Sequence, residues 1–532
     1  MSVAPPQNLL DLVGDERASL PQAFLARVAR SGDTDFVTWE NRRWSYIQAL
    51  EEVRRVRGFL DQTRAGAPGD RVASFLSNQP AAIWTWFGTA CGGGEFVALN
   101  RGHKGAVLAD MIGRSRARLL VTEASAVDVL PPLEPLGVET LVFTDAVPAG
   151  AQRLASEVLG WDTVVAATPG EVREVEPHAV AGLLYTSGTT GRSKAVLLSH
   201  NQLVRSAARL AEAYCLGPSD VMHTWPPLFH VTGQTYMVLS SVVAGGAVAL
   251  FPTFSRSRFW EQVRDTGATV TVGLGGIASM LLSVPEAPGD ADNSLRLAVL
   301  GGIPVEHVEP FERRFGTKVR EAFGSTEADP IATPDANSGA PPGSFGRPTA
   351  DFEMCVADAL DRPVPHGVLG QILVRPLVPD VMFRAYEDDD AATVAAWRNL
   401  WYHTGDMGVR DENGFYYFKG RDKFTIRRRG ENVSVVEVEE ILTAHPDVAE
   451  CVAIGVPAAV GDEDVKVAVV PLPGASLDPA EVHSFCNGRM ARFMVPRYIE
   501  VRDSLPYTEL AKVKREELGG TGPGVWDADG AA

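Results

Sequence analysis

The residues best suited to carry out chemistry in this chain form one stretch, from Tyr185 to Lys194. Only Thr, Ser and Gly occur between Thr186 and Gly191. Such a loop exposes backbone N–H groups and hydroxyls, and its glycines adopt dihedral angles that other residues avoid. A nest of donors of this kind suits phosphate oxygens, and a lysine adds positive charge for the same anion. The predicted phosphate-binding residues are Thr186, Ser187, Gly188, Thr189, Thr190, Gly191 and Lys194.

This stretch is not a Walker A loop, which needs Gly, four residues and then Gly-Lys-Ser/Thr opening into a helix. Here Lys194 comes three residues after Gly191, and the apolar segment that follows is typical of a strand. The alternative is a flexible surface turn, which would account for three or four such residues. Ten residues in this order favour an anion site.

The stretch resembles the phosphate-binding loop of the adenylate-forming enzymes, the superfamily of acyl-CoA synthetases, adenylation domains and beetle luciferase. The usual family pattern is Thr-Ser-Gly-Thr-Thr-Gly-x-Pro-Lys-Gly. This chain has Ser193 in place of the proline and Ala195 in place of the last glycine. The wording Arg-Gly-Glu-Asn-Val-Ser at 429–434 is closest to the carnitine/crotonobetaine and medium-chain acyl-CoA ligase branch.

Two further motifs match the family in the same order along the chain. Phe323-Gly-Ser-Thr-Glu resembles the aromatic-Gly-x-Thr-Glu motif, which implies that Phe323 stacks on adenine and Thr326 donates to the α-phosphate. Glu327 supplies an oxygen ligand of the kind that Mg²⁺ takes in a nucleotide site. Asp406, after Trp-Tyr-His-Thr-Gly, takes the place of the family aspartate that accepts the ribose hydroxyls. A surface aspartate after a glycine turn is the alternative for that residue.

The resemblance also implies a hinge and a mobile lid. Arg421 matches a residue near the nucleotide, and Lys423 matches the pivot. Lys512 takes the position of the catalytic lysine, although Ala511 replaces the usual glycine before it and Phe424 replaces an aspartate after the pivot. The acceptor-side loop implied for the incoming thiol contains Arg429, Gly430 and Glu431.

The substrate pocket is predicted from aromatic and glycine positions. Pro-Leu-Phe-His-x-x-Gly around His230 sits where the family places its next motif, so His230 is expected to border the carboxylate pocket rather than only to pack. Glycines that end two predicted strands would line the acyl and adenine pockets at the carboxyl edge of the sheet. The expected pocket residues are Trp225, Phe229, Tyr236, Gly275, Gly276 and Gly301, with Gly302 on the nucleotide side.

Composition excludes some classes of function. The net charge is −18, which argues against nucleic-acid binding through bulk charge. Five well-separated cysteines indicate reduced thiols in a cytoplasmic enzyme, and the chain shows no signal peptide. Apolar runs stay shorter than the roughly 18 residues of a membrane span. Hydrophobic residues make up 45% and charged residues 22%, as is ordinary for a globular protein.

Alternating strand and helix patterns predict an α/β fold with more than one domain, because 532 residues are too many for one core. We expect a large N-terminal domain (1–420) of parallel and mixed sheets covered by helices, with a β-rich subdomain. A small α+β lid domain (421–520) follows. The Gly/Ala/Asp-rich tail (521–532) is expected to be disordered.

The resemblance implies an ATP- and Mg²⁺-dependent ligase that adenylates a small-molecule carboxylic acid, releases pyrophosphate and passes the acyl group to coenzyme A. One alternative is adenylation for another acceptor, either a carrier protein or a route that activates nitrite for diazo formation. A second alternative is a degenerate member that binds nucleotide without turnover, and the four departures Ser193, Ala195, Phe424 and Ala511 are its support.

Overall fold

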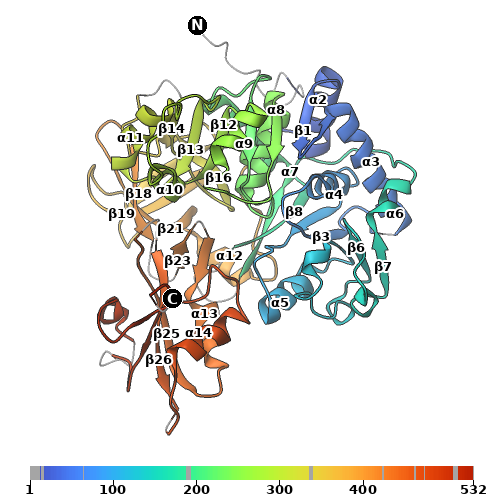
Figure 1. Ribbon diagram of the computed structural model, residues 1–532. Coiled ribbons are helices and arrows are strands. Elements are labelled where there is room, and N and C mark those ends of the chain that lie inside the picture. The colour runs from blue at the N-terminus through green and yellow to red at the C-terminus, as the bar shows by residue number, and fades with distance from the viewer. Residues whose placement is uncertain are drawn as a thin grey trace. The chain divides into compact units, whose positions relative to one another are not determined.

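The computed structural model describes residues 12, 17–63, 65–186, 193–334, 339–421, 425–429, 431–459, 463–472, 474–506 and 513–530 (Figure 1). They form two compact units. Unit 1 takes the described residues up to Arg101, Ile112–Tyr185 and Ala195–Gly420, and unit 2 takes Gly102–Met111, Thr186–Lys194 and the described residues from Arg421 on. The main division therefore falls at Gly420, but unit 2 also holds two segments that the sequence assigned to the N-terminal domain.

One sheet of unit 1 has seven strands among the described residues, in the order β7-β6-β5-β3-β4-β8-β9. Neighbouring strands from β7 to β8 run parallel. Strands β5 and β6 are largely apolar and buried along their whole length, as is typical of parallel strands covered on both faces. The bounds are β3 (Arg71–Phe75), β4 (Glu95–Ala98), β5 (Leu119–Thr122), β6 (Thr140–Phe143), β7 (Glu157–Gly160), β8 (Val180–Thr186) and β9 (Lys194–Ser199), with helices α3 (Tyr46–Gln62), α4 (Pro80–Ala90) and α6 (Trp161–Ala166). Helix α5 (Gly105–Ser115) precedes β5, and its residues up to Met111 belong to unit 2.

A second sheet of unit 1 also has seven described strands, in the order β14-β13-β12-β10-β11-β1-β2. All its pairs are parallel except the hairpin of β1 with β2. The strands are β1 (Asp35–Trp39), β2 (Arg42–Ser45), β10 (Val221–Thr224), β11 (Ala247–Leu250), β12 (Val270–Leu274), β13 (Leu297–Gly301) and β14 (Lys318–Arg320). The helices are α2 (Leu20–Ser31), α7 (His200–Ala213), α8 (Ser240–Ala244), α9 (Phe259–Thr266), α10 (Gly276–Leu282) and α11 (Val305–Phe315), with the π-helix η4 (Thr232–Leu239).

Local signals account for where these helices begin. Ser45 caps α3, since its side chain accepts from the Gln48 backbone N–H while the Gln48 side chain accepts from the Ser45 N–H. Ser19 and Gln22 make the same reciprocal box at the start of α2. Each box satisfies two N–H groups that a helix start leaves without partners.

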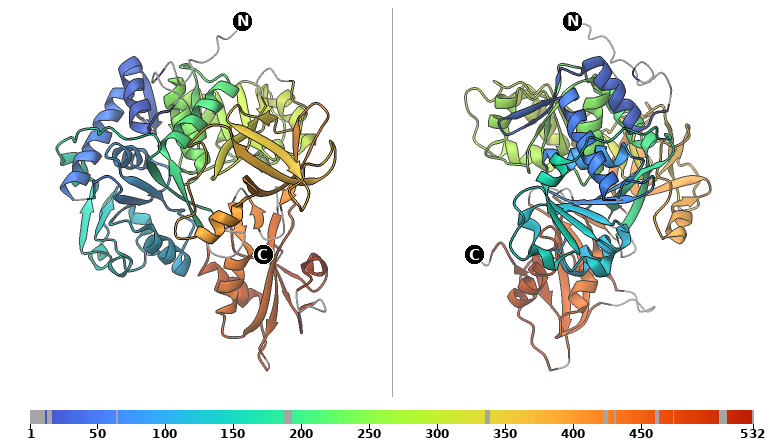
Figure 2. Two further views of the ribbon diagram at one scale, coloured as in Figure 1. Left: turned by 180° about the vertical axis from the view of Figure 1, so that it is seen from behind. Right: turned by 90° about the vertical axis from the view of Figure 1, so that its right-hand side faces the viewer.

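A β-rich part of unit 1 follows β14. It holds the sheets β15-β16-β17 and β18-β19-β21-β20, and β22 pairs with β21. The strands β18 and β19 run side by side in the rear view (Figure 2). The bounds are β15 (Phe323–Ser325), β16 (Ala328–Thr333), β17 (Arg347–Pro348), β18 (Phe352–Ala357), β19 (Gly370–Pro376), β20 (Trp397–Arg398), β21 (Trp401–Arg410) and β22 (Tyr416–Arg421), with helix α12 (Asp390–Ala396).

Unit 2 has its own apolar core, which includes Val433, Leu442, Val467 and Ile499. It contains a four-stranded sheet, β25-β26-β27-β28, and the hairpin β23-β24. The bounds are β23 (Thr425–Arg428), β24 (Glu431–Ser434), α13 (Val435–Thr443), β25 (Val448–Pro457), β26 (Glu463–Pro471), α14 (Pro479–Asn487), β27 (Tyr498–Val501), the 3-10 helix η5 (Arg515–Leu518) and β28 (Trp526–Asp527).

The expectation of a disordered tail is wrong for residues 521–530. Trp526 and Asp527 pair with β27, and Arg497 forms ion pairs with Asp527 and Asp529. Trp526 also packs against the unit 2 core. The Gly- and Asp-rich composition predicted disorder because it does not show that Trp526 packs on a core or that Asp527 pairs with Arg497.

The predicted fold class is confirmed: parallel sheets covered by helices, a β-rich part and a smaller α+β C-terminal part. Among the described residues, no helix has the length and apolar character needed to cross a bilayer.

Candidate active site

The Thr326–Glu327 turn is the best-defined part of the candidate site. It joins β15 to β16, and Glu327 is buried. The Gln202 side-chain amide, from α7, donates to the carbonyls of Thr326 and Glu327 at 3.3 and 3.2 Å. The backbone N–H of Phe383 donates to the Glu327 carbonyl at 2.7 Å. Donors from two distant segments therefore hold the turn in place.

The Glu327 carboxylate accepts a hydrogen bond from the Tyr386 hydroxyl at 2.8 Å. Burial, together with the charge of Glu327, raises the pKa of Tyr386 above its usual range, so its phenol keeps the proton that it donates. Burial also raises the pKa of the neighbouring Tyr402 phenol. Sequence patterns did not identify Tyr386 or Gln202, because neither lies in a motif and both are far from Glu327 along the chain.

This carboxylate fits a nucleotide-bound Mg²⁺ ion. Such an ion takes one or two protein carboxylates and completes its shell with phosphate oxygens and water. Among the residues that the structure describes, no group of three or more His, Cys, Asp or Glu side chains could share a metal ion.

The aromatic and glycine positions of the predicted nucleotide pocket lie on adjoining elements of unit 1. Phe323 is buried and stacks on Phe345, with ring centroids 4.5 Å apart. Gly302 follows β13 with a positive φ of 70°, and its N–H donates to the Glu321 carboxylate at 3.1 Å. Burial raises the pKa of Glu321 to about 7. The stacking of Phe323 on adenine stays a prediction.

Gly275 and Gly273 allow close approaches of other parts of the chain. A Cβ atom at Gly275 would lie 2.3 Å from the Ile303 Cα and 2.4 Å from the Gly302 carbonyl oxygen. At Gly273 it would lie 2.5 Å from the Trp225 ring. The missing side chains therefore admit the backbone after β13 and the indole of Trp225. The role of Gly275 in a substrate pocket stays a prediction.

His230 stands just before the π-helix η4, a helix form that is frequent at functional sites. Its ring lies 4.8 Å from the Phe229 ring, centroid to centroid. Within η4, Tyr236 is buried and donates its hydroxyl to Asp329 Oδ1 at 2.6 Å. Burial raises the pKa of Asp329 to about 7. Sequence patterns predicted Tyr236 as a pocket residue but contained no signal for Asp329.

Asp406 is buried and lies on an irregular part of β21. The register between β19 and β21 shifts there, since Gln371 pairs with Met407 but Leu373 pairs with His403. Gly405, inside the irregular part, has a φ of +75°. Three residues of β21, Thr404 to Asp406, therefore stand opposite the single residue Ile372 of β19, and a bulge of this kind bends the strand locally.

The loop and lid residues of the predicted site are only partly described. Thr186 ends β8 and Lys194 begins β9, while Ser187, Gly188, Thr189, Thr190 and Gly191 lie outside the described residues. Lys423, Gly430 and Lys512 lie outside them too, as do the departures Phe424 and Ala511. Arg421 ends β22, and Arg429 and Glu431 flank the turn between β23 and β24. Arg428, before that turn, is buried and paired with Asp464 at 3.0 Å.

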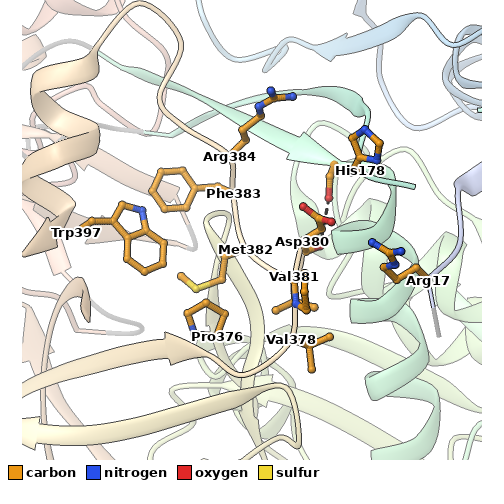
Figure 3. A pocket seen from close by; sticks show the side chains of 12 residues that line it. Arg17, His178, Pro376, Val378, Asp380, Val381, Met382, Phe383, Arg384 and Trp397 are labelled. Carbon is orange, nitrogen blue, oxygen red and sulfur yellow. Dashed lines mark hydrogen bonds between the residues drawn. The ribbon is translucent and has the colours of Figure 1, made fainter. Parts of the chain in front are cut away.

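A cavity of about 550 Å³ lies elsewhere in unit 1, along the segment from Pro376 to Arg384 (Figure 3). Trp397, Phe383 and Met382 form one side, and Arg17 and His178 lie on the other. Of the predicted catalytic residues that the structure describes, Thr326, Glu327 and His230 do not line it. Phe383 belongs to both places: it lines the cavity, and its backbone N–H donates a hydrogen bond to the Glu327 carbonyl.

The chain matches known families along most of its length. A family described as AMP-binding enzyme matches residues 24–386, and the AMP-binding enzyme C-terminal domain matches residues 437–512. The chain is 32% identical over 532 residues to a crotonobetaine/carnitine–CoA ligase of Salmonella paratyphi B, which covers 96% of this chain and 100% of that protein. A protein of the same name from Salmonella typhi is 31% identical over 529 residues, which cover 96% of this chain and 100% of that protein.

Solved structures share the fold. An o-succinylbenzoate CoA synthetase from Bacillus subtilis, bound with a product analogue, superposes with a TM-score of 0.81 at 23% identity, over 94% of this chain and 98% of that one. An amide bond synthetase from Marinactinospora thermotolerans superposes with a TM-score of 0.81 at 25% identity, over 93% and 99% of the two chains.

Proposed function

This chain belongs to the AMP-binding enzyme family, and on that premise we propose how its residues divide the work of an AMP-forming acid–CoA ligase. The reaction has two steps. A carboxylate oxygen of the acid attacks the α-phosphorus of ATP, and pyrophosphate leaves with the electrons of the broken P–O bond. The thiol of coenzyme A then attacks the acyl carbon, loses its proton, and displaces AMP.

The observation that carries this assignment is the Thr326–Glu327 turn. Its carboxylate is buried, held by Tyr386 and placed beside a residue that can donate to a phosphate. Mg²⁺ bound there would neutralise charge on the phosphates. Positioning and electrostatic stabilisation are the main sources of catalysis in such transfers.

Further roles follow from the family positions. Residues 186–194 hold phosphate oxygens, Asp406 accepts the ribose hydroxyls, and Phe323 packs at the adenine. Lys512 stabilises the charge that develops at the α-phosphate. The C-terminal part then turns about Lys423, and the loop with Arg429, Gly430 and Glu431 meets the thiol.

The acid is proposed to be a small molecule bound near His230 and Tyr236. The relatives named for crotonobetaine and carnitine make these two acids the first candidates. We also propose a cytoplasmic location. All five cysteines are free thiols, as is usual in the reducing environment of the cytoplasm.

The test is pyrophosphate release by the purified chain with Mg·ATP and a panel of acids, with and without coenzyme A, with products identified by mass. The panel contains crotonobetaine, carnitine, butyrate, benzoate, an amino acid and nitrite. A coenzyme A thioester is expected. Pyrophosphate release without a thioester would instead favour another acceptor, such as an amine or a carrier protein, or the activation of nitrite for diazo formation. An amine is included because a protein with the same fold is named an amide bond synthetase.

A further inference from the structure

Ser193, at the end of the phosphate loop, is bonded to helix α13 inside unit 2. Its backbone N–H donates to Glu437 Oε1 at 2.9 Å, and its hydroxyl donates to the same oxygen. Both residues are buried, with exposed fractions of 4% for Ser193 and 6% for Glu437. Two donors on one buried carboxylate oxygen form a strong contact, because hydrogen bonds to an ionised acceptor exceed those between neutral groups.

This contact gives a physical reason for a departure from the family pattern. The usual residue at this position is proline, which has neither an N–H nor a hydroxyl to donate. Serine supplies both donors. A proline here would leave the Glu437 carboxylate without these two partners in a buried place, which is costly for a charged group.

Glu437 lies close in the chain to the acceptor-side loop. Glu437 lies in the first turn of α13, and its own N–H donates to the Oγ of the cap residue Ser434 at 3.3 Å. Ser434 is also the last residue of β24, which begins at Glu431. One helical turn and one short strand therefore join the end of the phosphate loop to the predicted thiol-side residues.

We propose that Ser193 and Glu437 form a latch that positions the acceptor-side hairpin β23–β24 against the phosphate loop for acyl transfer to coenzyme A. The two are positioning residues, and the assignment rests on the proposed ligase function. Pyrophosphate has left before the second step, so the thiol must reach an acyl-adenylate that is still bound. The Ser193–Glu437 contact fixes the helix that follows the hairpin, and so sets where the hairpin meets the thiol. The latch acts on that second step, whereas attack of the acid on ATP does not need the hairpin.

The latch predicts a separation of the two half-reactions. The variants are E437A, which removes the acceptor, and E437Q, which keeps an acceptor oxygen without the charge. The matched control is E440Q, at an exposed glutamate on the same helix. Adenylation is followed as pyrophosphate release in a single turnover without coenzyme A, using the panel acid with the highest wild-type rate. Acyl transfer is followed as thioester formation after coenzyme A is added to the preformed adenylate.

We expect E437A to slow acyl transfer by about tenfold or more while adenylation stays within about twofold, with E437Q intermediate and E440Q like the wild type. S193A is measured alone and combined with E437A. In the double variant the loss in acyl transfer should be smaller than the product of the two single losses, because both changes act on one contact. Equal losses in both half-reactions, or no loss in acyl transfer for either Glu437 variant, would overturn the latch. A wild-type chain that adenylates without forming a thioester overturns the acceptor assignment, and the latch with it.

Discussion

Glu327 depends on a phenol 59 residues away for its hydrogen bond. We expect Y386F to lower kcat/KM for adenylation by roughly 10- to 100-fold, since a hydrogen bond to a charged group contributes about 1.5–3 kcal/mol. The midpoint for Mg²⁺ activation should also rise. Pyrophosphate release measured against Mg²⁺ and ATP concentration tests both.

The control for Y386F is Y417F, which removes a phenol hydroxyl elsewhere in unit 1. Tyr417 donates its hydroxyl to Asp411 at 3.1 Å, in the β-rich part of unit 1 and outside the predicted site. Y417F removes the same chemical group from the same kind of contact. If Y386F and Y417F have equal effects on the Mg²⁺ midpoint, Tyr386 does not act through Glu327.

A second prediction at the residue scale concerns pH and Asp329. Burial raises the pKa of Asp329 to about 7, above its value in the unfolded chain, so the native state holds the proton more tightly. Stability from this group is present at low pH and is lost as pH rises through about 4 to 7. D329N keeps an oxygen that can accept from Tyr236 and never ionises. The free energy of unfolding of D329N relative to wild type should therefore rise between pH 5 and pH 8, by about 1 to 3 kcal/mol.

D351N is the contrasting variant, and the free energy of unfolding of both variants is measured by urea titration at each pH. Burial alone would raise the pKa of Asp351, but hydrogen bonds from Arg205 and Arg209 outweigh it and hold the pKa below its usual range. Its titration therefore lies below pH 5. D351N should destabilise by a similar amount at pH 5 and pH 8, and a wild-type-like pH trend in D329N would contradict the account of Asp329.

At the scale of elements, the irregular part of β21 is expected to control the ribose aspartate. Gly405 has a φ of +75°, and a Cβ there would meet nothing within 4 Å. G405A therefore introduces backbone strain without a clash, at a cost of about 1–2 kcal/mol. We expect this strain to shift Asp406 and raise KM for ATP several-fold, as measured by initial rates of pyrophosphate release.

Gly414 offers a control with matched strain. It lies between β21 and β22 with a φ of +82°, and a Cβ added there would have its nearest neighbour 3.7 Å away. G414A should cost a similar amount of stability and leave KM for ATP unchanged. A rise in KM for both variants would show that general loss of stability, rather than the position of Asp406, changes ATP binding.

The sequence predicted local structure correctly where the interacting residues are close together in the chain. The Ser45–Gln48 box was sufficient to start α3, and the Thr326–Glu327 motif falls on a tight turn. Contacts between distant residues could not be predicted in this way. Tyr236 and Asp329 are 93 residues apart, and Ser193 and Glu437 are 244 apart. Periodicity within a short segment does not indicate which distant residues meet. The buried carboxylate of Asp329 and the Ser193–Glu437 contact were therefore found only in the folded structure.

At the scale of the whole molecule, the division into two compact units, each with apolar clusters of its own, predicts two cooperative steps of unfolding. The unit 2 core contains residues only from the described C-terminal part, from Ile426 to Trp526. The large core of unit 1 ends at Tyr416. A calorimetric scan should therefore resolve a smaller transition for unit 2 beside a larger one for unit 1.

Deleting residues 521–532 tests this division, because β28 belongs to unit 2 alone. The deletion removes the apolar contact of Trp526 and leaves Arg497 with Asp464 but without Asp527 and Asp529. The unit 2 transition should fall by roughly 3 °C or more, since a loss of about 1 kcal/mol lowers the melting temperature of a domain of about 100 to 150 residues by about 2–8 °C. The unit 1 transition should stay in place. Deleting only 531–532 is the control, because it keeps β28. An unchanged scan after the longer deletion would mean that residues 521–530 do not stabilise unit 2. An equal shift of both transitions would mean that the two units unfold together.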